Sequence, residues 1–455
     1  MYLADSRNST AGTPGTAAAP DTTRPGRRPA VPGTVLALGA VSLITDVSAE
    51  MITAVLPLYV VTALGLSPLG FGLLDGINNG VGALVRLAGG HLADGGGRRH
   101  KVVAGLGYGL SALCKPLLLL AQGLPAISAV LAVDRAGKGL RTAPRDAMIS
   151  LSTLPEHRGR AFGVHRAMDT AGALLGPLAA FAVLRIAVDG YDAVFTVSAC
   201  VAALGVLVLV LFVPARPGSE PSTARTSTAR PAATAPAPAR PALRDSLALL
   251  RRPDLRRLTL CAALLGLTTV SDAFLYLLLQ RELGVPAALF PLLPLGTAAV
   301  FLLLAVPLGA LADRAGRRRL FLAGHAALLL AYGLVLAPLH GPATVVAVLA
   351  LHGAFYAATD GVLAAATAGA VPTEHLGAGQ ALVGTGQALA RFVCSLAFGA
   401  AWSLWDGRSA LALAAVALAA AALGAARLLR TTDAPDRSPG GTADGDRPTP
   451  EGAPR

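Results

Sequence analysis

Apolar stretches long enough to cross a lipid bilayer recur along this chain from Gly33 to Leu429, with only short polar breaks between them. A transmembrane helix needs about 20 mainly apolar residues to span the hydrocarbon core. One such stretch would fit a single anchor, but this chain of 455 residues contains a dozen, and 54% of its residues are hydrophobic. A water-exposed surface does not account for that composition. We therefore predict a protein embedded in the bilayer.

The apolar stretches predict an all-α integral membrane fold. The twelve predicted transmembrane helices are 34–62, 69–92, 102–121, 125–146, 161–186, 192–213, 258–281, 287–311, 320–338, 343–366, 378–404 and 409–428. Between the sixth and seventh, Pro, Ala, Thr, Ser and Arg dominate without an apolar period, which is typical of a disordered linker. The predicted parts are a disordered N-terminus (1–32), a six-helix bundle (33–213), a linker ending in a short amphipathic helix (214–257), a second bundle (258–430) and a disordered tail (431–455).

Arginine and lysine are concentrated in alternate connections between the predicted helices. The rich side contains Arg98, Arg99, Lys101, Arg158, Arg160, Arg314 and Arg317–Arg319, whereas the other side has little beyond Arg281 and Arg408. Positive residues stay in the cytoplasm during insertion, so both termini are expected there. The net charge of +12 then belongs to cytoplasmic loops rather than to a nucleic-acid site. Only three of the 38 basic residues are lysine, a bias that suggests a high-G+C bacterial genome. The expected location is therefore the cytoplasmic membrane of a bacterium.

Two loops of the first half are repeated in the second half. Gly90-His-Leu-Ala-Asp94-Gly-Gly-Gly97-Arg98 returns as Gly309-Ala-Leu-Ala-Asp313-Arg-Ala-Gly316-Arg317, 219 residues later. A second loop, Pro155-Glu156-His157, is repeated as Pro372-Thr-Glu374-His375, with an offset of 218 residues between the two glutamates. Two matches at nearly one offset predict a six-helix unit duplicated in parallel, so that the two bundles are pseudo-symmetric.

The first repeated loop resembles the G-x-L-a-D-r-x-G-r-r motif that lies between helices two and three, and again between helices eight and nine, of the major facilitator superfamily. The second copy fits almost throughout, and the first departs at Gly95, where a basic residue is usual. The resemblance covers residues 33–430. It implies two six-helix bundles that rock about a midplane site and open it to each side in turn, with these loops at the gate, in a protein that works as a monomer.

Charged residues inside a membrane are costly and need a partner, a wet cavity or a function. The first predicted helix has Asp46 and Glu50 on one face, four residues apart. Two carboxylates this close repel each other, which suits a proton carrier. The alternative is that both are neutralised by cations of neighbouring helices.

The second predicted helix has a polar stripe of Asp75, Asn79 and Arg86 at helical spacing. This stripe should face the interior of the bundle and line the cavity. Hydrogen bonds between helices would explain Asn79 equally well.

The fourth predicted helix contains the most unusual run, Asp134-Arg135-Ala-Gly-Lys138-Gly139, followed by Arg141, Arg145 and Asp146. Lysine changes its protonation readily when buried, so Lys138 and Lys115 are candidates for ion coupling. The run resembles the superfamily's helix-four motif, R-x-x-q-G, whose arginine, here Arg135, is implicated in proton coupling in the family. As an alternative, the charges near the helix end anchor the helix or lock the inner gate.

The fifth predicted helix combines Arg166 and Asp169 with the run Gly172-Ala-Leu-Leu-Gly176-Pro177. The run resembles the g-x-x-x-G-P-x-x-G-G motif of the superfamily's antiporters, although Ala180 and Phe181 replace the closing glycine pair. The resemblance implies export. Close packing of helices alone would also explain Gly172 and Gly176.

The second half has fewer charges at membrane depth, and they are Asp272, Asp360 and Arg391, with Gln387 as a nearby amide. We therefore expect the first bundle to handle ion coupling and the second to supply more of the solute contacts. Asp272 is either a counter-ion for the solute or a simple partner of Arg391.

No motif of an enzyme, a nucleotide-binding loop or a metal site is found, and the four cysteines stand singly, so no cofactor or metal is expected. A membrane enzyme or receptor is disfavoured. We predict a proton-coupled secondary transporter that exports a small amphiphilic molecule, a drug or a metabolite, with proton-coupled uptake of a small organic anion as the alternative. The expected partners are the lipid bilayer, the solute and protons, and not nucleic acid.

Overall fold

The computed structural model describes residues 31–92, 98–154, 157–187, 190–214, 248–372 and 376–430, and within these ranges every regular element is a helix. The chain from Pro32 onward forms one compact unit. The helices of the first half are α1 (Gly33–Leu58), α2 (Pro68–Leu92), α3 (Arg98–Leu120), α4 (Leu124–Leu151), α5 (Arg158–Ile186) and α6 (Gly190–Phe212). Those of the second half are α8 (Pro253–Gly266), α9 (Asp272–Glu282), α10 (Leu292–Ala315), α11 (Arg317–Leu336), α12 (Pro342–Ala370), α13 (Leu376–Leu404) and α14 (Gly407–Arg430). The predicted all-α membrane fold is confirmed.

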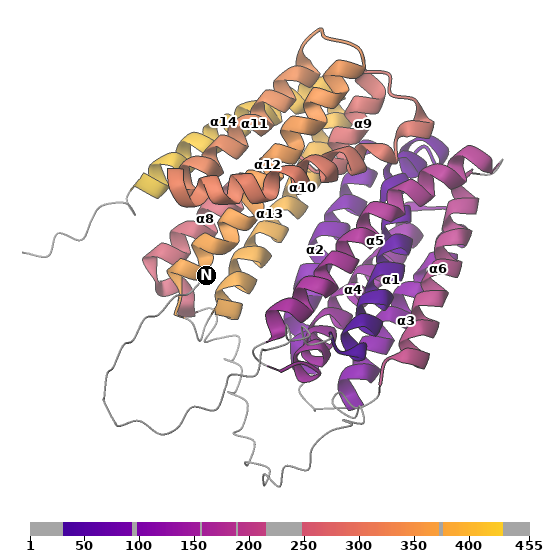
Figure 1. The fold of residues 1–455 in the computed structure, drawn as a ribbon. Helices are drawn as coiled ribbons and strands as arrows, with labels where there is room; N and C mark the ends of the chain where they lie inside the picture. The colour runs from indigo at the N-terminus through magenta and orange to yellow at the C-terminus, as the bar shows by residue number, and fades with distance from the viewer. Residues whose placement is uncertain are drawn as a thin grey trace, which may run out of the picture. The chain divides into compact units, whose positions relative to one another are not determined.

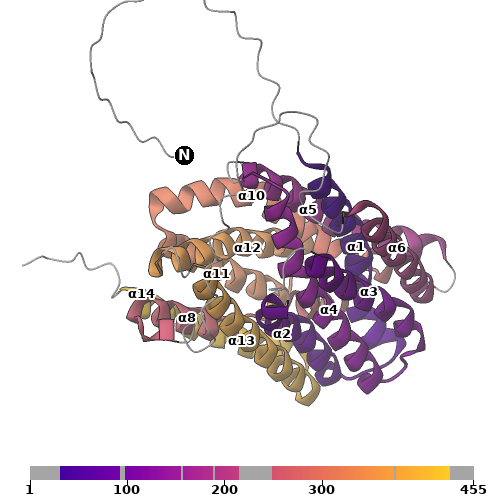
Figure 2. The same ribbon diagram turned by 90° about the horizontal axis from the view of Figure 1, so that it is seen from below.

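Each half is a bundle of its own helices. In the first half α1 packs against α5 and α6, and α4 packs against α2 and α3. In the second half α12 packs against α10 and α11, while α8 packs against α13 and α14. Figure 1 shows the two groups, indigo to magenta and pink to yellow, next to each other. The largest contact between them joins α2 to α13, which lie side by side in Figure 2.

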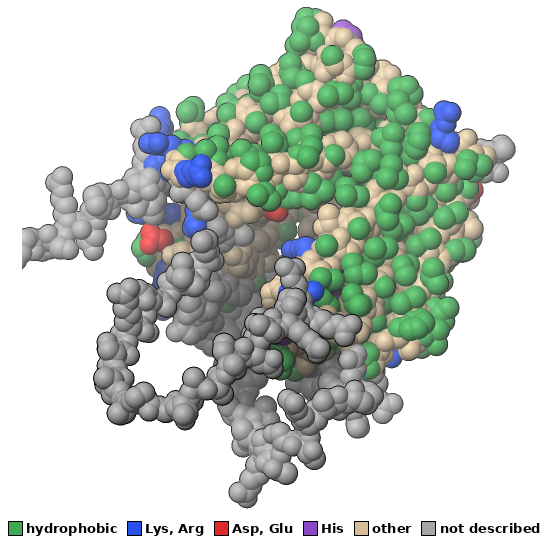
Figure 3. Space-filling model, viewed as in Figure 1, with side chains coloured by type: hydrophobic (Ala, Val, Ile, Leu, Met, Phe, Trp, Pro, Cys, Tyr) green, Lys and Arg blue, Asp and Glu red, His purple; other side chains and the backbone are tan. Residues whose placement is uncertain are grey.

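Apolar side chains cover the outside of the bundles. Leu303, Val306 and Val416 are each at least two-thirds exposed, and hydrophobic atoms dominate the face that Figure 3 shows. Such an extensive apolar surface requires lipid around it. By length and composition, nine helices of the described ranges are able to cross a membrane. The chain is therefore a multi-pass membrane protein.

The nine helices do not include α2, α4 or the pair α8 and α9. Helices α2 and α4 contain polar and charged residues, and α8 and α9 are too short. Helices α2, α4 and α9 contribute side chains to the site described below, as does the segment between α8 and α9.

The predicted span 258–281 is not one helix but two. Helix α8 ends at Gly266 and α9 begins at Asp272. Non-helical backbone at membrane depth must find other hydrogen-bond partners, and here the amide of Val270 donates to the Tyr332 hydroxyl at 2.9 Å. The break places a segment of irregular backbone between the two bundles. Helix α8 also begins earlier than expected, because Pro253 stands at its first turn.

Candidate solute and ion-coupling site

Glycines allow the two halves to touch at one end of the interface. A Cβ atom at Gly72 of α2 would lie 2.5 Å from the carbonyl oxygen of Ser395 in α13, and one at Gly399 would lie 2.5 Å from the carbonyl oxygen of Pro68. No side chain fits into such gaps, so the backbones of α2 and α13 are in direct contact. Phe274 of α9 adds to the seal, with its ring centroid 4.9 Å from those of Phe71 and Phe398.

The halves separate towards the other end of the same helices. A Cβ at Gly384, near the start of α13, would meet nothing within 4 Å. A hollow of about 400 Å³ lies here, with Arg135 and Lys138 on one wall and Gln380 on the other. Helix α2 ends at Leu92 on this side of the first half, and α3 begins at Arg98.

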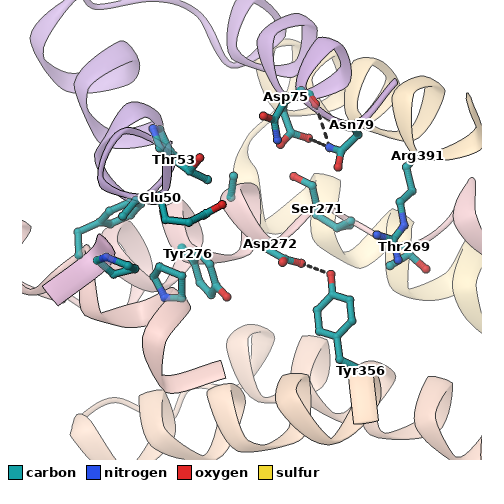
Figure 4. Close-up of a pocket in the computed structure, with 18 residues that line it drawn as sticks. Glu50, Thr53, Asp75, Asn79, Thr269, Ser271, Asp272, Tyr276, Tyr356 and Arg391 are labelled. Atoms are coloured by element: carbon teal, nitrogen blue, oxygen red, sulfur yellow. Dashed lines mark hydrogen bonds between the residues drawn. The ribbon is translucent and has the colours of Figure 1, made fainter. Parts of the chain in front are cut away.

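A smaller cavity of about 220 Å³ lies between this hollow and the sealed end, and it shares Asn78 and Asn79 with the hollow. Figure 4 shows that both halves contribute to its wall. The first half provides Glu50, Thr53, Asp75, Asn78, Asn79 and Pro177, and the second provides Thr269, Ser271, Asp272, Tyr276, Tyr356 and Arg391. The break between α8 and α9 supplies Thr269, Ser271 and Asp272, which a continuous helix would orient differently.

Three carboxylates and one guanidinium line this cavity. The Tyr356 hydroxyl donates a hydrogen bond to Asp272 at 2.6 Å, and His352 Nε2 lies 3.3 Å from the same carboxylate oxygen. The Arg391 guanidinium lies over the Tyr356 ring, 6.0 Å from its centroid, and its Nε has no hydrogen-bond partner among the described residues. Asp272 therefore has Tyr356 and His352 as neighbours instead of the direct pairing with Arg391.

Asp75 connects the two halves. It is 7% exposed, and the Ser395 hydroxyl of α13 donates to its Oδ2 at 2.5 Å. The amide of Asn79, one turn further along α2, donates to the same oxygen at 3.3 Å. Asn79 thus both forms a hydrogen bond within the bundle and lines the cavity.

Asp46 and Glu50 have different surroundings, although one helical turn separates them. Arg141 Nη2 donates to Asp46 at 3.2 Å, and the guanidinium also lies over the Tyr108 ring, 4.4 Å from its centroid. Lys138 Nζ lies 3.8 Å from both carboxylates, so it joins Asp46 to Glu50. Asp46 is buried among cations, whereas Glu50 is on the cavity wall.

Asp169 of α5 belongs to a second group of charges on the first half. Arg145 Nη1 lies 3.7 Å from Asp169 and Arg145 Nη2 lies 3.1 Å from Asp146. Arg166 approaches Asp169 at 3.9 Å, with 80% of its side chain exposed. None of these residues lines the cavity.

Lys115 forms a buried pair with Asp134 at 2.9 Å, between α3 and α4. Arg135 Nη2 lies 3.5 Å from the other oxygen of Asp134. Helices α3 and α4 come unusually close here, because a Cβ at Gly107 would lie 2.7 Å from the carbonyl oxygen of Gly137. Lys115 is therefore away from the solute cavity, whereas Arg135 reaches the larger hollow.

The glycines of α5 pack against α1. A Cβ at Gly172 would lie 2.5 Å from the Leu43 carbonyl oxygen, and one at Gly176 would lie 2.6 Å from the Glu50 Cβ. Close packing accounts for both glycines. Pro177, which follows them, reaches the cavity wall.

The other predicted site residues lie outside the cavity. Asp360 and Gln387 line a small recess with Arg391. Gly309 lies within α10, and Gly316, between α10 and α11, has φ of +94°, a backbone conformation that favours glycine, directly before Arg317. Gly90 lies within α2, whereas Asp94 and Gly97 fall outside the described residues, as do the side chains of Arg86, Arg98 and Asp313.

Several residues in the cavity or bonded to its wall were not predicted from the sequence. Ser395, Tyr356 and His352 have contacts that become visible only when α12 and α13 meet α2 and α9. The glycines at 72, 76 and 80 were a signal for the α2–α13 contact, since their spacing of four places them on one helix face. Within the described residues no group of three or more His, Cys, Asp or Glu side chains could hold a metal ion.

Comparison with known proteins connects this geometry to a class. Residues 38–302 and 258–452 match the family model described as Major Facilitator Superfamily. An uncharacterised MFS-type transporter of Methanocaldococcus jannaschii is 28% identical over 335 residues, which is 71% of this chain and 77% of the relative. An uncharacterised protein of Mycobacterium tuberculosis is 34% identical over 160 residues, covering 34% of this chain and 38% of that protein.

Solved structures share the fold. The nucleoside transporter NupG superposes with a TM-score of 0.69 at 14% identity, and the match covers 87% of this chain and 99% of that one. The peptide transporter POT in complex with sulfate gives a TM-score of 0.68 at 16% identity over 88% of this chain and 94% of that one. Two helical bundles around a shared polar cavity define a membrane transporter. The chain belongs to the major facilitator superfamily, which confirms the resemblance seen in its repeated loops.

Proposed function

We propose that the protein is a proton-coupled secondary transporter that exports a small solute from a bacterial cell through the cavity between its halves. The observation that carries this proposal is the cavity of about 220 Å³, in which Glu50 and Asp75 of one half face Asp272 and Arg391 of the other. Burying an ionisable group at membrane depth costs free energy, so such groups indicate a pathway for a solute or an ion. A site at the junction of two repeated bundles is where rocking would expose the solute to each side in turn.

Glu50 is the best candidate for the proton carrier. Its carboxylate is on the cavity wall and 3.8 Å from Lys138, whose side chain is 38% exposed and also lines the larger hollow. A proton on Glu50 removes its attraction to Lys138, so binding a proton changes the contacts of α1 with α4. Asp46 has a structural part in this proposal, since Arg141 and Lys138 already neutralise it.

The direction of transport rests on two arguments. The run from Gly172 to Pro177 resembles the antiporter motif, and the hollow beside the cavity opens near the arginine-rich connections, which we expect in the cytoplasm. Solute would enter from that side and leave when the contact between α2 and α13 opens.

The second candidate function is proton-coupled uptake of a small organic anion. It is favoured by Arg391, which has no ion pair within the described ranges, and by Arg135 and Lys138 on the hollow next to the cavity. Both functions use the same cavity and the same inward flow of protons, and they differ in the direction in which the solute moves.

The test is proton flux in inverted membrane vesicles energised by respiration. Proton-driven export predicts that a transported solute accumulates in the vesicles and dissipates the proton gradient. Glu50→Gln should abolish this response, and Asp192→Asn, a change outside the cavity, should retain it. If solute instead leaves preloaded vesicles together with protons, uptake by symport is the function. A wild-type response in Glu50→Gln would remove Glu50 from the coupling mechanism.

A further inference from the structure

The charges on the wall of the 220 Å³ cavity are separated in space. The first half provides Glu50 and Asp75, and the second provides Asp272 and Arg391. Figure 4 shows Glu50 and Arg391 reaching in from opposite sides, with Asp272 between them. Glu50 and Arg391 thus present opposite charges to the cavity from opposite sides, with the Asp272 carboxylate between them.

Arg391 has no ion pair among the described residues. No carboxylate of the described helices lies within ion-pair distance of its guanidinium, although Asp272 and Asp360 line the cavity and the recess that Arg391 also lines. Its Nε is buried without a hydrogen-bond partner, and the guanidinium lies over the Tyr356 ring. An unpaired cation at membrane depth is costly. An anionic group of a bound solute would remove that cost, and carboxylate is the group that the planar guanidinium binds best.

The carboxylates are not all satisfied either. The side chain of Asp272 is 42% exposed, although Tyr356 and His352 contact it. The side chain of Glu50 is 27% exposed, and the Nζ atom of Lys138 lies 3.8 Å from its carboxylate oxygen. Both carboxylates keep oxygen lone pairs free for a donor such as an ammonium group.

A solute of a single charge would satisfy only part of this wall. A simple anion would bind Arg391 but would lie against three carboxylates, and a simple cation would leave Arg391 without a partner. A molecule with both charges satisfies the two sides together. The cavity of about 220 Å³ has room for a small molecule, and it adjoins the hollow of about 400 Å³ at Asn78 and Asn79.

We infer that the solute is a small zwitterion of the amino-acid type, whose carboxylate binds Arg391 and whose ammonium group binds Asp272 and Glu50. This inference rests on the proposed function, because it assigns the transported solute to that cavity. It also provides a link between binding and closure, since one molecule bridges Glu50 of the first half and Arg391 of the second.

The test measures binding in the absence of a proton gradient. The purified full chain in detergent is heated with each proteinogenic amino acid or with 4-aminobutyrate, and the shift of its unfolding temperature is recorded. Each compound of the panel is tested beside its N-acetyl derivative, which lacks the ammonium group, and its methyl ester, which lacks the carboxylate. At least one zwitterion should stabilise the protein, and both derivatives should bind at least ten-fold more weakly.

Variants assign the two ends of the solute. Arg391→Gln should weaken zwitterion binding at least ten-fold, and Asp272→Asn should do the same, while Arg391→Lys should recover part of the loss. Arg408→Gln is the matched control, because Arg408 pairs with Glu282 at 3.8 Å outside the cavity. Folding of every variant is checked by its unfolding temperature without added compound.

The inference is overturned if only esters or only N-acetyl compounds stabilise the protein, if no compound of the panel does, or if Arg391→Gln binds like the wild type. Its failure is distinct from that of the proposed function. Zwitterion binding without proton flux in vesicles would refute proton coupling alone, and proton-driven flux of a purely cationic amphiphile without zwitterion binding would refute this inference alone.

Discussion

The Ser395 hydroxyl of α13 donates a hydrogen bond of 2.5 Å to the Asp75 carboxylate of α2, so this hydrogen bond connects the two bundles beside the cavity. Asp75 is 7% exposed and Ser395 is 1% exposed. In an alternating-access cycle this contact must break whenever the sealed end opens. Its strength therefore contributes to the balance between the two conformations.

Ser395→Ala should shift that balance towards the state in which the sealed end is open. A hydrogen bond to a charged group contributes about 1.5–3 kcal/mol, which corresponds to at least a ten-fold change in the equilibrium. The measurement is the rate at which a membrane-impermeant thiol reagent, added to right-side-out cells, modifies a Thr53→Cys variant in a background without the native cysteines. Ser409→Ala, at an exposed position in the first turn of α14, where the Ser409 hydroxyl bonds Asp406, should leave the rate unchanged. An equal rate in Ser395→Ala and the wild type would contradict the prediction.

Gly72→Val should force α2 and α13 apart. The added side chain would collide with the Ser395 carbonyl, and overpacking of this kind costs about 1–3 kcal/mol. Gly109→Val makes the same chemical change on α3 at a position where a Cβ meets nothing within 4 Å. We expect a lower unfolding temperature and impaired transport for Gly72→Val and neither effect for Gly109→Val. Similar behaviour of the two variants would show that helix propensity, and not the close contact, determines the result.

Lys115→Met should destabilise the protein strongly, because it leaves Asp134 buried without its closest cation. Breaking a buried ion pair costs about 3–5 kcal/mol, whereas replacing both partners by apolar residues is often neutral. The double variant Lys115→Met with Asp134→Leu should therefore unfold at a temperature close to that of the wild type. Thermal unfolding in detergent measures this. If the double variant is stable but does not transport, the pair has a role in ion coupling and not only in structure.

Tyr332→Phe should destabilise the break between α8 and α9. The change removes the hydroxyl that accepts the Val270 amide hydrogen, and an unsatisfied buried donor costs about 1–3 kcal/mol. Hydrogen exchange of the Val270 amide should increase at least ten-fold. The control is Tyr191→Phe, because the Tyr191 ring packs on Tyr59 of the first half, away from this break. Unchanged exchange in Tyr332→Phe would mean that another group protects the amide.

The positions of the helices could be predicted well from the sequence, and those of the site only in part. Asp75, Asp272 and Arg391 were expected in the cavity because charge at membrane depth is rare, and the structure places all three on its wall. Lys115 and Glu50 were both candidates for ion coupling in the sequence. In the structure Lys115 is paired with Asp134 between two helices, whereas Glu50 faces the cavity. Helical periodicity indicates which residues share a face, but not which neighbour that face meets.

The sequence by itself determined the membrane environment, the helices and the duplicated design, because apolar length and the repeated loops are local properties of the chain. Only the tertiary structure decided that the seventh span breaks at Leu267, that Ser395 meets Asp75, and that Arg391 remains without a carboxylate among the described residues. The physical reason is that each depends on a partner far away in sequence. Tyr332 stabilises the broken backbone and the glycines of α2 admit α13, and such distant contacts form only when the bundles pack.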